Sequence, residues 1–138
     1  MQDRPTLTEL IDAVRGFIER DVVTALDGTA KFHARVAANV LAIVGRELAH
    51  EDEHRLAEWQ RLDALLGAEP LPPPAALRDA LLQRSEALCA RIRAGDADGG
   101  PFRTATLAHV RATVREKLIV ANPKLLSPAG GQTGEVKG

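Results

Sequence analysis

The fold of this chain is decided by the stretch FHARVAANVLAIV, residues 32–44. At about 100° per residue, this stretch is apolar over roughly half of a helix circumference. A narrow strip of small residues runs beside the apolar arc, and a thin polar stripe fills the remainder. The apolar arc comprises Phe32, Val36, Val40, Leu41, Ile43, Val44 and Leu48, and the small strip comprises Ala34, Ala38 and Gly45. The pattern predicts a central helix that neighbouring helices cover, leaving only the polar stripe exposed.

Four further stripes at helical spacing flank this central helix, which is expected from about residue 30 to residue 48. The first stripe begins at a Thr6-x-x-Glu9 capping box, in which each side chain can bond a free backbone amide of the other residue. Residues 49–53 are polar, and both a turn and a helical continuation fit them. The stripes end at Gly28, Gly67, the loop 95–100 and Asn122-Pro123.

No segment of useful length alternates apolar and polar residues, so we expect no β-strand. Five amphipathic helices with short connections are typical of an α-helical bundle. We therefore predict an all-α fold, a single-domain bundle of about five amphipathic helices around a central helix, formed by residues 1–126. Residues 127–138 are rich in glycine and small polar residues, and we expect them to form a flexible C-terminal tail.

The composition excludes several classes of function. The 138 residues carry a formal net charge of -1 and only 3% aromatic residues, so we expect neither a nucleic-acid nor a membrane partner. Cys89 is the only cysteine, which excludes an internal disulfide and a cysteine-rich zinc site and indicates a reducing, cytoplasmic location. No apolar run approaches the roughly 18 residues of a membrane span, and the N-terminus lacks the apolar segment of a signal peptide.

The polar stripe of the central helix supplies the first candidate site. Lys31, Arg35 and Asn39 follow one another at four-residue steps and are neighbours on one face. If the first helix continues as far as Asp21, this residue falls on its apolar face, where a carboxylate requires a cation such as Arg35. The favoured interpretation is a buried clamp of Asp21, Arg35 and Asn39 that orients the two helices. The alternative is a binding site in which Lys31 and Arg35 meet a carboxylate, a phosphate or a partner protein.

A second candidate is the segment His50-Glu51-Asp52-Glu53-His54. Its His-Glu-x-x-His spacing is that of zinc proteases, but the two central residues are charged where an active-site helix usually packs apolar ones. The chain has two Glu-x-x-His motifs, Glu47-x-x-His50 and Glu51-x-x-His54. Di-iron bundles need this motif on two different helices, and here the two copies follow each other in one segment. His109, the conceivable third ligand, lies opposite the apolar stripe of its helix and is expected to be exposed. We therefore expect no metal and no other cofactor, with His50 and His54 as weak metal candidates.

No catalytic residue can be assigned from the sequence. Cys89 lies on a largely apolar side of its helix and is interpreted as a small buried hydrophobic residue rather than a nucleophile. The chain contains no nucleophile elbow, phosphate loop or dinucleotide-binding fingerprint. The sequence therefore favours a protein that is not an enzyme, without deciding the question.

Several short motifs resemble those of one family. They are Asp3-Arg4-Pro5-Thr6, Glu19-Arg20-Asp21-Val22, the Phe-His-x-Arg-Val-x-x-Asn pattern of residues 32–39, and Asn122-Pro123. On these motifs the chain resembles the DUF6285 family of small helical bacterial proteins from Arg4 to Pro123. Members of that family often have an aromatic residue soon after Asn-Pro, where this chain has Lys124-Leu125-Leu126. The resemblance implies an accessory role in acyl or small-molecule metabolism, because members are often encoded beside phosphotransferase-like kinases and acyl-CoA dehydrogenases.

These observations predict a helical accessory protein that binds a protein partner, such as a phosphotransferase-like kinase, with a homo-oligomer as a further possibility. The alternative is a small-ligand-binding or catalytic helical bundle that uses the cluster of Asp21, Arg35 and Asn39. A metal-binding bundle that uses His50 and His54 is the weaker alternative.

Overall fold

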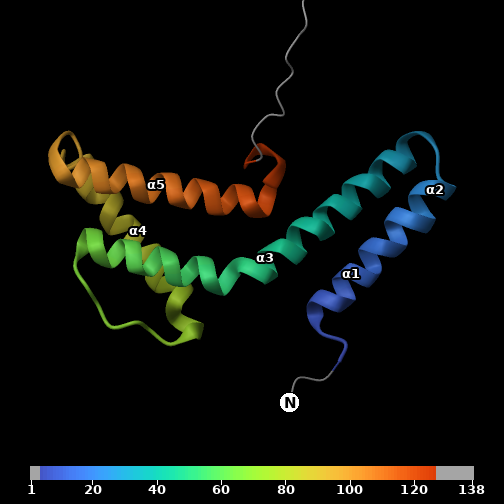
Figure 1. The fold of residues 1–138 in the computed structure, drawn as a ribbon, viewed down its shortest axis with the longest axis horizontal. Helices are drawn as coiled ribbons and strands as arrows, with labels where there is room; N and C mark the ends of the chain where they lie inside the picture. The colour runs from blue at the N-terminus through green and yellow to red at the C-terminus, as the bar shows by residue number, and fades with distance from the viewer. Residues whose placement is uncertain (1–3, 127–138) are drawn as a thin grey trace, which may run out of the picture.

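The computed structural model of the chain describes residues 4–126 (Figure 1). Within this range the chain is all-α, as predicted, and contains no strand. The helices are α1 (Leu7–Phe17), α2 (Val23–Ala25), α3 (Gly28–Leu66), α4 (Pro74–Arg93) and α5 (Gly100–Ala121); the π-helical turn η1 (Ile18–Val22) joins α1 to α2, and the 3-10 turn η2 (Pro123–Leu126) follows α5. None of the helices in residues 4–126 has the length and apolar character needed to cross a bilayer. The tail predicted at residues 127–138 lies outside the described residues.

The helix ends follow local signals in the sequence. Thr6 and Glu9 form the predicted capping box, in which the Thr6 amide donates to Glu9 Oε2 at 2.7 Å and the Glu9 amide donates to Thr6 Oγ1 at 3.2 Å. Gly67 ends α3 with a φ of 100°, a backbone conformation that favours glycine. Pro74 occupies the first turn of α4, where its missing amide costs nothing. Gly28, expected to stop the first helix, is instead the first residue of α3.

The predicted central helix and the helix expected after it are one continuous element. α3 contains 39 residues and is about 58 Å long at 1.5 Å per residue. The undecided residues 49–53 continue the helix, because they contain no glycine or proline and Glu51 forms an ion pair with Arg55 one turn later. The prediction of about five helices around a central helix is therefore corrected to four helices of at least 11 residues within the described range, α1, α3, α4 and α5.

α3 connects two parts of the molecule (Figure 1). Its first half, residues 28–48, runs antiparallel to α1, and these segments are called the hairpin below. Its second half, residues 49–66, packs against α4 and α5, and these three helices are called the three-helix unit. Within the described residues the backbone of α1 does not approach α4 or α5, so the two parts are joined through α3, whose Arg46 also contacts α5.

The hydrophobic core lies in the three-helix unit. It is formed by Trp59, Leu62, Leu65, Leu77, Leu81 and Leu88, contributed by α3 and α4. Leu62 is fully buried at its centre, and Phe102 at the start of α5 packs against the cluster. The core therefore sits at the C-terminal half of α3 and not at the stretch that we expected to be most buried.

The apolar arc of residues 32–48 is largely exposed, which contradicts the prediction of a covered central helix. Phe32 is 63% exposed and Val40 is 50% exposed. The buried residues of this half of α3 are Ala34 and Ala38, from the small strip. α1 packs on the small side of α3, and a Cβ added at Gly45 would touch Ile11 of α1 at 3.9 Å. Most of the large apolar side chains of the arc are therefore exposed on the side of α3 that α1 does not cover.

Candidate functional site

The predicted clamp of Asp21, Arg35 and Asn39 does not form. All three residues are exposed, and within the described chain no ion pair joins Asp21 to Arg35. Lys31 is half-buried, and its Nζ lies 4.0 Å from Asp27 Oδ1. Asp21 lies in the π-helical turn η1, whose wider turn shifts later residues away from the α-helical register that places Asp21 on the apolar face. The alternative, a binding site on this stripe, stays a prediction.

His50 and His54 are half-buried neighbours on α3. Their rings stack with centroids 5.3 Å apart and an interplanar angle of 10°. Over residues 4–126 no group of three or more His, Cys, Asp or Glu side chains is arranged to hold a metal ion. The third ligand that we considered, His109, lies on α5 and not beside this pair.

His109 is buried, contrary to the prediction that it is exposed. α5 faces α3 with its polar side, on which Thr106 and His109 are buried. Burial lowers the pKa of His109, with a smaller lowering from the nearby Arg61 guanidinium and an opposing effect of Glu116. The apolar stripe of α5, including Val110 and Val114, is turned outward. α5 therefore repeats the arrangement seen in the hairpin, with the apolar stripe on the open side.

Cys89 is exposed, so the interpretation as a buried hydrophobic residue is also wrong. α4 packs on α3 through Leu77, Leu81, Arg84 and Leu88, which recur at spacings of four, three and four residues. Cys89 follows Leu88 directly and is turned away from that face, because successive helical residues differ by about 100°.

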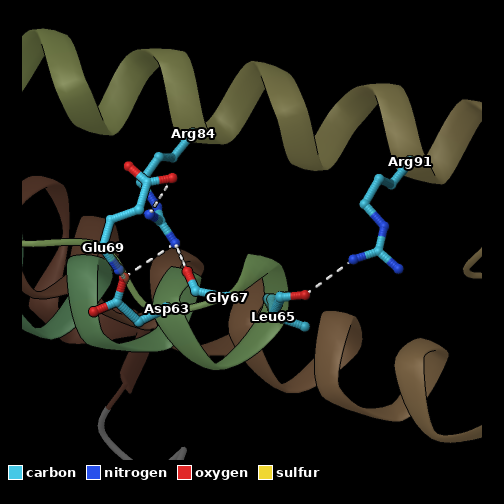
Figure 2. A network of polar contacts seen from close by, with 6 residues as sticks. All are labelled: Asp63, Leu65, Gly67, Glu69, Arg84 and Arg91. Carbon is cyan, nitrogen blue, oxygen red and sulfur yellow. Dashed lines mark hydrogen bonds and ion pairs between the residues drawn. The ribbon is translucent and has the colours of Figure 1, made fainter.

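A buried arginine on α4 organises the contact with α3 (Figure 2). Arg84 is 5% exposed, and its Nη2 donates to the carbonyl oxygen of Gly67 at 2.7 Å and lies 3.0 Å from Asp63 Oδ1. Its Nη1 lies 3.0 Å from Glu69 Oε1, a carboxylate that is mostly in solvent. The guanidinium carbon also lies 4.8 Å from the centroid of the Trp59 ring. Arg84 thus binds the C-terminal end of α3 and the start of the next loop.

A second arginine extends this contact one heptad further along α4. Arg91 Nη1 donates to the carbonyl oxygen of Leu65 at 3.1 Å (Figure 2). Its Nε donates to Asp96 Oδ2 at 2.7 Å, and its guanidinium carbon lies 4.1 Å from the centroid of the Phe102 ring. Cations near the last carbonyls of a helix also oppose the negative end of its dipole. The two arginines are therefore structural: Arg84 holds the loop between α3 and α4, and Arg91 links Leu65 of α3 to Asp96 in the loop after α4.

Two polar contacts join α3 to α5. Arg61 donates to both carboxylate oxygens of Glu116, each at 2.7 Å, and Arg46 Nε donates to the carbonyl oxygen of Val120 at 2.6 Å. The first is a bidentate pair, the strongest geometry for an ion pair between side chains. Burial raises the pKa of Glu58, one turn before Arg61. These contacts fix the position of α5 along α3.

A polar cleft of about 530 Å³ opens between α3, α4 and α5. It is lined by Glu47, Glu51, His54, Arg55, Glu58, Arg78, Asp79, Leu81, Leu82, Ser85, Thr113, Glu116, Lys117 and Val120. Two of its carboxylates already have partners, since Glu51 pairs with Arg55 and Glu116 with Arg61. Both charge signs are mixed along the lining, so the cleft offers no concentrated charge for a ligand.

An apolar groove of about 450 Å³ runs between α5 and η2. Val110, Val114 and Leu118 supply one side, and Leu126 from η2 supplies the other. Arg111 and Arg115 also line the groove. Neither arginine has a carboxylate partner among residues 4–126. The α5–η2 groove therefore combines an open apolar floor with available positive charge.

The two helices of the hairpin also expose large apolar side chains. We call this set the hairpin face, and it comprises Leu7, Leu10, Val14 and Phe17 of α1 with Phe32, Val36, Val40, Val44 and Leu48 of α3. Each of these side chains is exposed. Nine exposed large apolar side chains on two adjacent helices are more than scattered surface residues would supply, and such exposure often marks a site of interaction.

Comparison with known proteins gives the family but no activity. No curated protein and no solved structure matches the chain. The family described as "Domain of unknown function (DUF6285)" matches residues 24–125, which span α3, α4, α5 and nearly all of η2. The matched range begins after α1. It therefore contains the whole three-helix unit but only one of the hairpin's two helices, the first half of α3. Because the match covers most of the chain, this protein belongs to the DUF6285 family.

Proposed function

We propose that this protein is a helical accessory protein, not an enzyme, that binds a protein partner in the α5–η2 groove. The observation that supports the proposal is the outward apolar stripe of α5 beside Leu126. Helix-in-groove recognition needs an apolar channel that accepts side chains at helical spacing. The single cysteine is consistent with work in a reducing cytoplasm.

The groove selects an occupant of defined chemistry. Val110, Val114 and Leu118 lie at four-residue steps and fit an amphipathic helix whose apolar side chains recur at the same spacing. Arg111 and Arg115 favour carboxylates beside that apolar stripe, since guanidinium groups bind carboxylates in bidentate geometry. The proposed partner segment is therefore an amphipathic helix flanked by Asp or Glu.

The family resemblance makes a phosphotransferase-like kinase encoded beside the gene the first partner to test. In this proposal the chain contributes binding surface to the metabolism of acyl groups or small molecules and supplies no reacting group. The alternative of a ligand site at Asp21, Arg35 and Asn39 gains no support from either cavity described above, because none of the three lines them.

The experiment is a calorimetric titration of the purified kinase with the full chain and its variants. Val114→Asp adds a charge to the apolar floor and should weaken binding at least tenfold, because burying one valine is worth about 1.5–3 kcal/mol. Arg111→Glu tests the charged side of the groove, and its effect should shrink as salt rises. Leu82→Asp is the matched control, since Leu82 is 60% exposed on α4 outside the groove. Equal affinity for the wild type and Val114→Asp would contradict the proposal.

A further inference from the structure

We propose that two copies of this chain associate through their hairpin faces into a four-helix bundle. The proposal concerns a different surface from the α5–η2 groove and does not depend on it. Three observations support it: the hairpin buries no large side chain, the chain exposes more surface than a compact monomer of its mass, and the side chains of the hairpin face are uncharged.

The hairpin buries almost nothing within one chain. Its buried residues are Gly16, Ala34 and Ala38, none of which has a large side chain. Every large buried apolar residue of the described chain belongs to the three-helix unit. Helices in water owe most of their stability to packing of an apolar face, and two helices joined through small residues lack that packing. Two such hairpins can supply it to each other, as in bundles of four antiparallel helices.

The accessible surface is large enough for a dimer interface. A monomeric globular protein of 14.8 kDa exposes about 7,000 Å², whereas this chain exposes 10299 Å². The residues outside 4–126 could account for at most about 2,100 Å² if each had the surface of an unfolded chain. The described residues still exceed expectation by about 1,700 Å². The exposed stripe of α5 accounts for part of this excess, so two copies that covered the hairpin share would bury at most about 3,400 Å² together, and the obligate range begins at about 2,000 Å².

A second copy is the occupant that fits the chemistry of this face. The nine side chains of the hairpin face are aliphatic or aromatic, so pairing them with the same nine side chains of a second copy across a two-fold axis opposes no like charges among them. None of the nine is an arginine, whereas Arg111 and Arg115 line the α5–η2 groove and give it a preference for an acidic partner. Residues 127–138 contain one large apolar side chain, Val136, which is too little to cover nine.

The test is the molar mass of the full chain in solution, measured by light scattering after size exclusion and by sedimentation equilibrium at about 1–100 µM. The expected mass is twice the 14.8 kDa of the chain. Val40→Glu puts a carboxylate into the hairpin face and should convert the dimer to a monomer over this range. Leu82→Glu is the matched control, because Leu82 is 60% exposed but lies on α4. It should remain a dimer.

A milder variant separates loss of association from loss of folding. Val40→Ala introduces alanine, a strong helix former, and removes two methyl groups. In a two-fold interface both copies lose these groups. It should raise the dimer dissociation constant at least tenfold while leaving the far-ultraviolet circular dichroism of the dimer unchanged. A monomeric wild type at 100 µM, or a Val40→Ala variant with the wild-type dissociation constant, would overturn the proposal. Val114→Asp should stay dimeric, so a failure of the groove and a failure of the hairpin face can be told apart.

Discussion

Replacement of Arg84 by alanine tests the contact that holds α4 on α3. The change removes a 2.7 Å hydrogen bond to Gly67 and the 3.0 Å ion pair with Asp63. Breaking a buried ion pair from one side costs roughly 3–5 kcal/mol, because the remaining charge is left unpaired. The Asp63 side chain is 24% exposed and therefore partly hydrated after the change. The contact with Glu69 is mostly in solvent and adds little. We expect Arg84→Ala to lower the free energy of unfolding by about 3 kcal/mol.

The assay is urea denaturation followed by fluorescence of Trp59, the only tryptophan. Trp59 is buried with the Arg84 guanidinium over its ring, so its emission reports directly on this part of the core. With a urea m-value of about 1.5 kcal/mol/M, a loss of 3 kcal/mol moves the midpoint down by about 2 M. Arg78→Ala is the control on the exposed side of the same helix, and it should change stability by no more than about 0.5 kcal/mol. A loss below about 1 kcal/mol for Arg84→Ala would refute the reasoning.

Four further predictions follow from individual residues. Because burial holds the pKa of His109 below 6.5, the unfolded state binds more protons near that pH, and stability should fall as pH drops through 6.5. His109→Gln should flatten this part of a plot of urea midpoint against pH. Arg35→Ala should change the free energy of unfolding by no more than about 0.5 kcal/mol, since the side chain is exposed. A loss of several kcal/mol in a denaturant melt would instead support the buried clamp with Asp21. Cys89 should react fully with a thiol reagent in the folded protein, and an absorbance titration that stays unreactive until denaturant is added would show it buried. Elemental analysis should find no stoichiometric zinc or iron, and one equivalent lost on changing His50 and His54 would contradict that expectation.

The helix positions were largely predictable from the sequence because they depend on local chemistry. The capping box at Thr6, the glycine at Gly67 and the proline at Pro74 act within one or two turns, and the structure has helix ends at each of them. The continuity of α3 was left open because residues 49–53 contain neither a breaker nor an apolar pattern. Neighbouring turns decide the conformation of such a segment.

Which side of each helix is covered could not be predicted in the same way. Periodicity identifies an apolar stripe, as on the first half of α3 and on α5, but it does not identify what covers the stripe. Both helices contact their neighbours through other residues, including Ala38 and His109, and both leave the apolar stripe open. An interface with another molecule would produce the same sequence pattern as a core within one chain.

The residues of the candidate site also differ in whether the sequence could reveal them. Arg84 carries a detectable signal, because it occupies a core position between Leu81 and Leu88 on the buried side of α4. A charged residue at such a position indicates a buried partner. The α5–η2 groove carries no comparable signal. It exists because η2 brings Leu126 back along α5, where Leu126 lines the same groove as Val114 and Leu118, and that return depends on the tertiary fold.

The continuity of α3 also fixes the angular relation between the hairpin face and the α5–η2 groove. Each residue of an α-helix adds about 100° of rotation and 1.5 Å of rise. Inserting one alanine near Ala49 would therefore turn the whole hairpin by about 100° relative to the three-helix unit, with almost no change in length, and would break the hydrogen bond from Arg46 to Val120. Inserting seven, close to two full turns, would nearly restore the original orientation and lengthen α3 by about 10 Å. Helical phase, more than distance, then determines whether a dimer presents its two grooves to the same side.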